Sequence, residues 1–408
     1  MRYRHIDGRT VLFLCISGIG VLWGPVGGWG EEFSYRHKAG DLYRILSTVR
    51  EDVYVDRVLS HRAEILNRIA VEVRSVSEEK GRHRAVFQTS ERSAGAGRQG
   101  FQWSREYDSE FDRDRLGYIT IDPGYYMPVV RNVPVFPDRD LEAGERWSAE
   151  GHEMHDFRDS FGIADPYRIP FTADYVFLGE REWRGKRYPA FSVSYRIFSE
   201  PEAVRGRVWP SRIQGASDQI VYWDRELGQA RAYTENFRMI FSLSDGRTVE
   251  YRGSAGAEIA ESARMDREKI AGDITGDIGR LGIDGATVRV VDEGIAISLQ
   301  DIRFQADQAA LLPEEREKLD KIAGILRRYG DRDILVAGHT ALAGTEGGRR
   351  KLSLERAAAV AEYLIARGVR SADRVVVRGF GAEKPVADNR TEEGMRRNRR
   401  VEITILEN

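Results

Sequence analysis

Apolar and polar residues alternate along the first part of the chain. From about residue 32 to residue 253, short runs rich in β-branched and aromatic residues are separated by turn signals such as Asp122-Pro123-Gly124 and Glu226-Leu227-Gly228. This pattern is typical of strands with one buried face, and about ten to twelve such strands favour an antiparallel β sandwich or barrel. The clearest runs are residues 63–75, 84–89, 117–121, 190–198, 219–223 and 229–242.

The pattern changes at Ala257. Between Ala257 and Gly282, apolar residues recur every three or four positions, which is typical of an amphipathic helix. Residues 287–291 and 294–304 then predict two strands, joined as a hairpin across Asp292-Glu293. We therefore expect residues 257–293 to form a connector of one helix and one strand.

The last part of the chain alternates helix and strand. The pattern predicts a helix over residues 313–329 with Pro313 in its first turn, and a second over residues 352–367 that ends at Gly368. The predicted strands are residues 334–337, 374–378 and 401–406. This order of elements is β, α, β, α, β, β.

Several separated motifs lie on these elements. They are Phe304 with Leu312-Pro313, Gly338-His339-Thr340 with Gly344, Leu352-Ser353 through Ala357, Gly379-Phe380-Gly381 with Pro385, and Asn398-Arg399-Arg400-Val401. In this order and spacing, residues 294–408 resemble the OmpA-like peptidoglycan-binding domain. The resemblance implies a small mixed sheet with helices on one face, and a domain that holds the peptide stem of peptidoglycan.

The resemblance also implies a ligand clamp. Arg356 matches the family arginine that pairs with the carboxylate of a diamino acid in the stem. We expect it in the first turn of its helix, where the helix dipole also favours an anion. The family aspartate that takes the ammonium directly follows Gly-His-Thr, and here that position is Ala341. Arg349 and Met395 also depart from the family pattern, which has Asn and Arg at these positions.

Two interpretations of the altered clamp stay open. In the first, the site binds a different stem peptide, with Glu346, Glu355 or a backbone carbonyl taking the ammonium, or binds only the carboxylate. In the second, the scaffold persists and peptidoglycan binding is lost. Asn398 and Arg400 fit either a binding or a structural role, and we interpret His339 as a loop-fixing residue. The candidate binding residues are Thr340, Ala341, Gly344, Leu352, Arg356, Asn398 and Arg400.

The first thirty residues read as a signal peptide. A basic start precedes an apolar run over residues 10–26, and Gly28-Trp29-Gly30 offers small residues for cleavage after Gly30. An uncleaved membrane anchor is the alternative. Cys15 is the only cysteine, which excludes an internal disulfide, and lipidation at Cys15 is a further alternative. We therefore expect the protein to be located in the periplasm, with or without association with the outer membrane.

Composition narrows the function further. The 408 residues predict more than one domain, here residues 1–30 (signal peptide), 31–256 (β-rich), 257–293 (connector) and 294–408 (OmpA-like). The 63 Lys and Arg are dispersed among 65 Asp and Glu, which argues against nucleic acid as a partner. The run His152-Glu153-Met154-His155 lacks the spacing of a helical metal site, because on a strand the two histidines point to opposite faces.

The sequence contains no catalytic triad, phosphate loop or nucleotide motif, so we predict no enzymatic activity, cofactor or metal. The aromatic residues of the β-rich part are read as core, with a ligand-lined cavity as the alternative. We predict a non-catalytic cell-envelope protein that tethers to or senses peptidoglycan with weakened or altered stem recognition. The alternative is an envelope scaffold whose OmpA-like fold has lost that binding and contacts envelope proteins instead.

Overall fold

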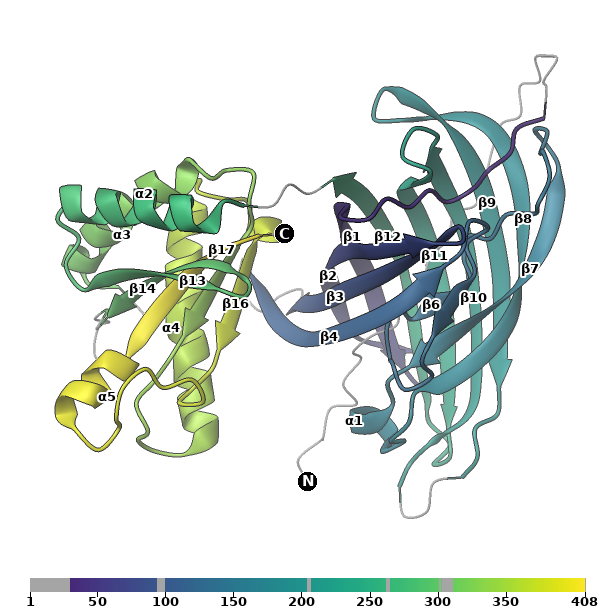
Figure 1. Ribbon diagram of the computed structural model, residues 1–408. Helices are drawn as coiled ribbons and strands as arrows, with labels where there is room; N and C mark the ends of the chain where they lie inside the picture. Colours follow the sequence, from purple (N-terminus) through teal and green to yellow (C-terminus); the bar gives the residue numbers. More distant parts are fainter. Residues whose placement is uncertain are drawn as a thin grey trace. The chain divides into compact units, whose positions relative to one another are not determined.

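The computed structural model describes residues 30–93, 100–203, 207–261, 265–300, 302 and 311–407 (Figure 1). The chain divides into two compact units. The first takes the described residues up to Thr89 and those from Glu106 to Ser262, and the second takes those of Ser90–Arg105 and Ala263–Asn408. Residues 1–29 of the predicted signal peptide, which include Cys15, lie outside the described residues, and so does Phe304.

The first unit is built of antiparallel strands. One run of neighbours is β10-β11-β12-β1-β2-β3-β4, with β5 paired to β4, and a second is β6-β7-β8-β9. In Figure 1 the long strands β7 to β11 curve strongly. The antiparallel pairing is confirmed, whereas closure into a sandwich or barrel stays a prediction. The strands are β1 Leu42–Val55, β2 Val58–Ser77, β3 Lys80–Ser93, β4 Phe101–Arg113, β5 Ile119–Ile121, β6 Val130–Arg131, β7 Arg146–His155, β8 Tyr167–Trp183, β9 Lys186–Ser199, β10 Pro210–Asp224, β11 Gln229–Leu243 and β12 Thr248–Glu261, with one short helix, α1 Arg158–Phe161.

Tight turns and a large aromatic core hold these strands. Asp56 and Arg57 both have positive φ, which matches the twist that a two-residue hairpin between β1 and β2 requires. Inside, Phe136 packs its ring 4.7 Å from Trp223 and 5.1 Å from Phe191, both edge to face. Such contacts contribute about 0.5–1.5 kcal/mol each beyond the burial of their area.

The helix predicted from Ala257 begins ten residues later. Strand β12 continues to Glu261 and pairs with β1, where Ile45 faces Ile259. Ala255, Ala257 and Ile259 are buried alternately, so this segment follows a period of two rather than that of a helix. Helix α2 (Arg267–Arg280) begins after Asp266, whose side chain accepts the N–H of Lys269. The apolar spacing of this segment fits both a helix and a strand, and pairing with β1 makes it a strand.

The second unit contains a mixed sheet, as the resemblance implied. Its order is β16-β15-β17-β14-β13, with β15 and β16 parallel and the other pairs antiparallel. The hairpin of β13 and β14 turns at Asp292-Glu293, as predicted. The elements after α2 are β13 Ala286–Val291, β14 Gly294–Gln300, α3 Pro313–Arg327, β15 Ile334–Gly338, α4 Glu346–Ala366, a 3₁₀ turn Ala372–Arg374, β16 Val375–Gly379, α5 Glu392–Asn398 and β17 Arg400–Leu406.

The two faces of this sheet are packed differently. Apolar residues of α2, α3 and α4 share one core with alternate residues of β14 to β17, so these helices cover one face (Figure 1). On the other face Leu335, Val376 and Leu406 pack against Trp103. The first residues of β4 belong to this unit, because Phe101 and Gln102 pair in parallel with Val376 and Val377.

Two further helices of the second unit differ from the sequence prediction. Helix α4 begins at Glu346, six residues before the predicted Leu352, because Thr345 caps it by accepting the N–H of Gly348 at 3.2 Å. Helix α5 was not predicted at all, since it is only seven residues long and contains Gly394. Among the described residues, no helix combines the length and apolar character needed to cross a membrane.

Candidate functional site

The residues after β15 are locked to α4 and to the loop after β16. A side chain at Gly338 would collide with the carbonyl of Ser353, so only glycine lets the strand approach the helix this closely. The N–H of Thr340 donates to the carbonyl of Gly381 at 2.8 Å, and that of Phe380 donates to Gly338 at 3.0 Å. The Gly-His-Thr and Gly-Phe-Gly motifs thus form one rigid corner of the domain.

Arg356 does not lie at the start of its helix. Because α4 begins at Glu346, Arg356 is ten residues further along, in the middle of the helix. The prediction that the helix dipole favours an anion at Arg356 is therefore wrong, since the effect of the dipole fades beyond the first turn. Arg356 is half-buried. The N-terminus of α4 would therefore not help to hold an anion at Arg356.

Ala341 lies in the corner and is buried, with 6% of its surface exposed. Its methyl group offers no acceptor for an ammonium. The neighbouring hydroxyl of Thr340 is buried without a hydrogen-bond partner among the described residues. The loop that follows is held by the N–H of Leu342, which donates to Asn389 at 3.0 Å, and reaches α4 through Gly344 with φ of +75°.

The two carboxylates considered as substitutes both have cationic neighbours on α4. Glu346 lies 3.3 Å from the guanidinium of Arg350, and Glu355 lies 3.9 Å from the ammonium of Lys351. Both pairs are one helical turn apart and largely solvated, so they contribute little to stability. Leu352, on the same part of the helix, is an exposed apolar side chain.

Asn398 is fully buried, and its amide is used inside the domain. Its oxygen accepts the N–H groups of Val386 at 2.8 Å and Ala387 at 3.0 Å. Its nitrogen donates to the carbonyl of Ala387 at 2.8 Å and to Asn389 at 2.9 Å. Since Asn389 in turn holds Leu342, this amide fixes the loop beside Ala341.

Arg400 and His339 are both buried at the end of the sheet. Arg400 donates to Glu402 at 2.8 Å and to the carbonyl of Lys384 at 3.0 Å. The ring of His339 stacks on Phe380 at 5.2 Å between centroids. Burial, followed by the charge of Arg400, lowers the pKa of His339 to about 3. The imidazole is therefore neutral at pH 7, so its Nε2, which lies 3.7 Å from a carboxylate oxygen of Glu402, does not form an ion pair.

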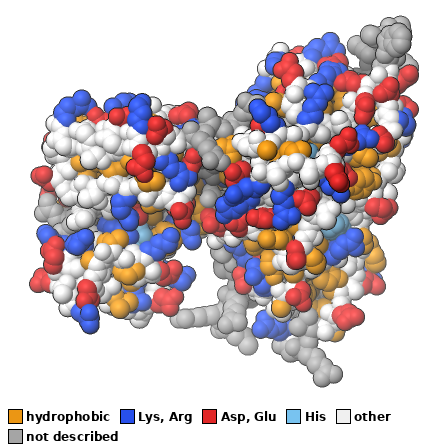
Figure 2. All heavy atoms as spheres, viewed as in Figure 1, with side chains coloured by type: hydrophobic (Ala, Val, Ile, Leu, Met, Phe, Trp, Pro, Cys, Tyr) orange, Lys and Arg blue, Asp and Glu red, His pale blue; other side chains and the backbone are white. Residues whose placement is uncertain are grey.

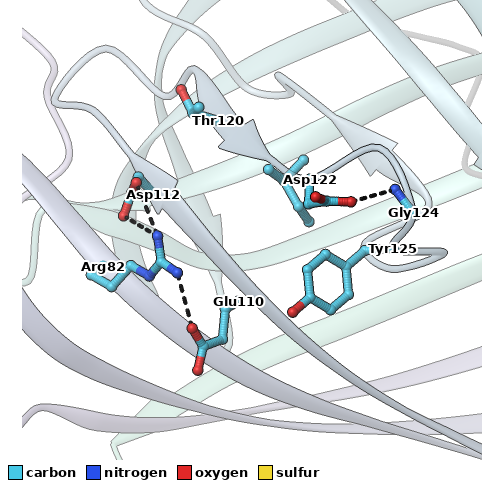
Figure 3. Close-up of a pocket in the computed structure, with 8 residues that line it drawn as sticks. Arg82, Glu110, Asp112, Thr120, Asp122, Gly124 and Tyr125 are labelled. Carbon is cyan, nitrogen blue, oxygen red and sulfur yellow. Dashed lines mark hydrogen bonds and ion pairs between the residues drawn. The ribbon is translucent and has the colours of Figure 1, made fainter.

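Charges elsewhere are balanced. On the face drawn in Figure 2, basic and acidic side chains intermingle on each unit. A surface hollow of the first unit holds about 430 Å³, and there Arg82 pairs with Glu110 at 2.9 Å and with Asp112 at 3.3 Å (Figure 3). In the described part of the chain, no cluster of three or more His, Cys, Asp or Glu could hold a metal ion. His155 instead bonds Glu153 at 2.8 Å in the interior.

The sequence suggested a cavity in the β-rich part only as an alternative and did not identify Arg113. The first unit contains an apolar cavity with Arg113 in its lining. Arg113 lies on the same face of β4 as the buried Phe111. An arginine at such a position reads as a surface residue unless the fold is known.

Comparison with known proteins places the C-terminal part of the chain. Residues 303–399 match the model of the OmpA family, so the chain carries an OmpA-like domain at this end. The chain is 40% identical over 110 residues to the peptidoglycan-binding protein ArfA of Mycobacterium tuberculosis, covering 27% of this chain and 33% of ArfA. It is 42% identical over 106 residues to outer membrane protein A of Bordetella avium, covering 26% of this chain and 54% of that protein.

A solved structure is also similar to part of the chain. The cell wall anchor of the T6SS from Pseudomonas aeruginosa is 31% identical, with a TM-score of 0.30, covering 35% of this chain and 99% of that structure. The chain therefore spans about a third to a half of the curated relatives named above, and those matches cover about a quarter of it.

Proposed function

We propose that this chain is a non-catalytic protein of the cell envelope that tethers to or senses peptidoglycan through its OmpA-like domain. The observation that carries the proposal is the family match over residues 303–399, together with relatives named for peptidoglycan binding and for the outer membrane. We place the protein in the periplasm on the same ground. In this proposal the second unit, which contains residues 294–408, faces the cell wall, and the first unit forms a β-rich domain of its own.

Recognition of the stem peptide is weakened or altered in this proposal. Arg356 supplies the carboxylate-binding half of the clamp, and Ala341 lacks the carboxylate that would take the ammonium. The hydroxyl of Thr340 next to Ala341 is a neutral acceptor in the same corner. A neutral oxygen binds an ammonium less strongly than a carboxylate, so binding depends mainly on Arg356.

An envelope scaffold without peptidoglycan binding is the second candidate. It is supported by the complete internal use of the Asn398 amide and by the bonds of Arg400 to Glu402 and Lys384. These two residues of the candidate site then serve the fold alone. In that case the domain contacts other envelope proteins instead.

Sedimentation with purified peptidoglycan separates the two candidates. The full chain should sediment with the polymer, and a soluble stem peptide that carries a diamino dicarboxylic acid should release it. A protein without affinity for the cell wall should stay in the supernatant at every polymer concentration. That second result would favour the scaffold.

A further inference from the structure

A cavity of about 200 Å³ lies inside the first unit. Its walls are the inner faces of β1 to β4, residues of β10 and β11, and the loop that contains Met127 and Pro134. Most of its lining is apolar, including Ile69, Val71 and Phe87. For scale, an apolar cavity of about 150 Å³ admits a molecule of the size of benzene. The space therefore suits a short apolar group.

Arg113 puts a positive charge into this lining. Its guanidinium carbon lies 4.8 Å from the ring centroid of Tyr35 and 5.6 Å from that of Phe111. Its Nε is buried and has no hydrogen-bond partner among the described residues. Buried polar groups are normally bonded, so a donor of this kind beside a cavity calls for a partner.

The neighbouring carboxylates are used elsewhere. Asp112 pairs with Arg82 on the other face of β4. Asp114 accepts the backbone N–H groups of residues 116, 117 and 118 at 2.9–3.0 Å. Among the described residues, Arg113 forms no ion pair with an acid, and its guanidinium lies instead over the rings of Tyr35 and Phe111.

A second polar atom in the lining points to the same conclusion. Asn67 is 8% exposed and lies on the same face of β2 as Ile69 and Val71. Its oxygen accepts the hydroxyl of Thr89 at 2.9 Å, and its nitrogen has no partner in the described part of the chain. If the amide is turned over, its oxygen is left without a partner instead.

The two histidines whose pKa the charge of Arg113 affects, His37 and His83, are neutral at pH 7. Burial, then the charge of Arg113, lowers the pKa of His83 to about 3, and the same two causes lower the pKa of His37. At neutral pH, Arg113 is therefore the charged side chain among Arg113, His37 and His83. A guanidinium favours carboxylate and phosphate, which it can bind through two N–H groups at once.

We propose that this cavity binds a single-chain amphipathic anion, with its apolar tail against Ile69, Val71 and Phe87 and its carboxylate or phosphate at Arg113. The amide of Asn67 then meets a polar atom of the same ligand. The site lies in the β-rich unit and is independent of peptidoglycan binding. A fatty acid and a lysophospholipid share this chemistry and differ in the anion that they present.

The test is a titration of the full chain with octanoate, octyl phosphate, 1-octanol and acetate, followed by calorimetry. Octanoate or octyl phosphate should bind, and the preferred one identifies the anion. Acetate should bind far more weakly, since each buried methylene contributes about fourfold in affinity. Octanol should bind at least tenfold more weakly than the preferred anion, because it lacks the charge-assisted bond to Arg113.

Two variants and a control make the result specific. Arg113→Gln should lower affinity for the anions at least tenfold and leave that for octanol unchanged. Ala85→Leu should fill the cavity and abolish binding of the anions and of octanol. Ala230→Leu replaces it if Ala85→Leu does not fold. Arg82→Gln, on the other face of the sheet, should bind like the wild type.

Three results would overturn the proposal. The first is the absence of binding by every anion tested. The second is equal binding of octanol and the anions, which would leave an apolar cavity without a charge site. The third is binding that survives both Ala85→Leu and Ala230→Leu, which would place the ligand elsewhere.

Discussion

The side chain of Ser353 accepts the backbone N–H of Gly381 at 2.9 Å and donates to the carbonyl of Arg350 at 2.9 Å. Ser353 is fully buried, so this one hydroxyl joins α4 to the loop after β16. The bond belongs to the corner that also holds Thr340 and Ala341. A serine that the sequence presents as part of a helix motif is thus a cross-link between two motifs.

Ser353→Ala should therefore destabilise the second unit by about 1–3 kcal/mol, because it leaves the buried N–H of Gly381 without a partner. Chemical unfolding of the full chain, followed by hydrogen exchange in residues 375–381, measures this. Ser371→Ala is the matched control, since the side chain of Ser371 is exposed and makes no cap bond. Equal stability of the two variants would show that the corner does not depend on this hydroxyl.

Trp103 should contribute to the stability of the second unit although it is far in sequence from the rest of that unit. It is 7% exposed and packs on Leu335, Val376 and Leu406. Trp103→Ala should lower the free energy of unfolding of this unit by about 3–5 kcal/mol, as for other large buried side chains. Leu342→Ala, at a side chain that is 61% exposed, should have almost no effect.

Hydrogen exchange can locate the effect of Trp103→Ala. Faster exchange confined to β15, β16 and β17 would agree with the packing. Unchanged exchange in these strands would contradict it.

His339 should make the second unit less stable in mild acid. Its pKa is about 3 in the fold and 6.5 in the unfolded chain, so the unfolded state binds its proton first as the pH falls. Stability is fully present above about pH 6.5 and decreases from there to about pH 3. Between pH 7.5 and pH 5 this one group should account for a loss of about 2 kcal/mol.

Urea unfolding of the wild type and His339→Gln at both pH values measures this contribution. The variant should lose less stability between the two, whatever its stability at pH 7.5. His61→Gln is the control, because His61 is much less buried. An equal pH dependence of wild type and His339→Gln would mean that the imidazole titrates normally in the fold.

The sequence predicted the type of each secondary-structure element better than its first and last residues. Strand alternation and turn residues predicted the antiparallel sheet because side-chain burial and turn geometry are local properties. The stretch around Ile259 was assigned to a helix because its apolar spacing fits both periods. Only pairing with Ile45 on β1, which is distant in sequence, decides between them.

The candidate site was predicted less completely. The motifs identified Arg356, but its place in the helix was wrong because Gly347 and Gly348 hide the true start at Thr345. The structural role of Asn398 depends on the loop from Val386 to Asn389, which no local pattern reveals. Arg113 could not be distinguished from a surface arginine, since its burial comes from strands and a loop far away in sequence.

The altered clamp gives the last prediction. If Arg356 pairs with a stem carboxylate, Arg356→Ala should reduce affinity for a defined stem peptide roughly ten- to a hundredfold, as expected for a charge-assisted bond of about 1.5–3 kcal/mol. Arg316→Ala is the control, because Arg316 is an exposed arginine on α3. Isothermal titration of the full chain against stem peptides measures both.

Restoring the missing carboxylate tests the other half of the clamp. Ala341→Asp should raise affinity for stems with a diamino dicarboxylic acid, because the new carboxylate can accept the ammonium that the methyl group cannot. Ala341→Asn adds a similar volume without the charge, and should gain much less. Since Ala341 is buried, the folding of both variants must first be verified by their unfolding transitions. If Arg356→Ala loses nothing and Ala341→Asp gains nothing, the clamp is a relic, and the domain serves as a scaffold.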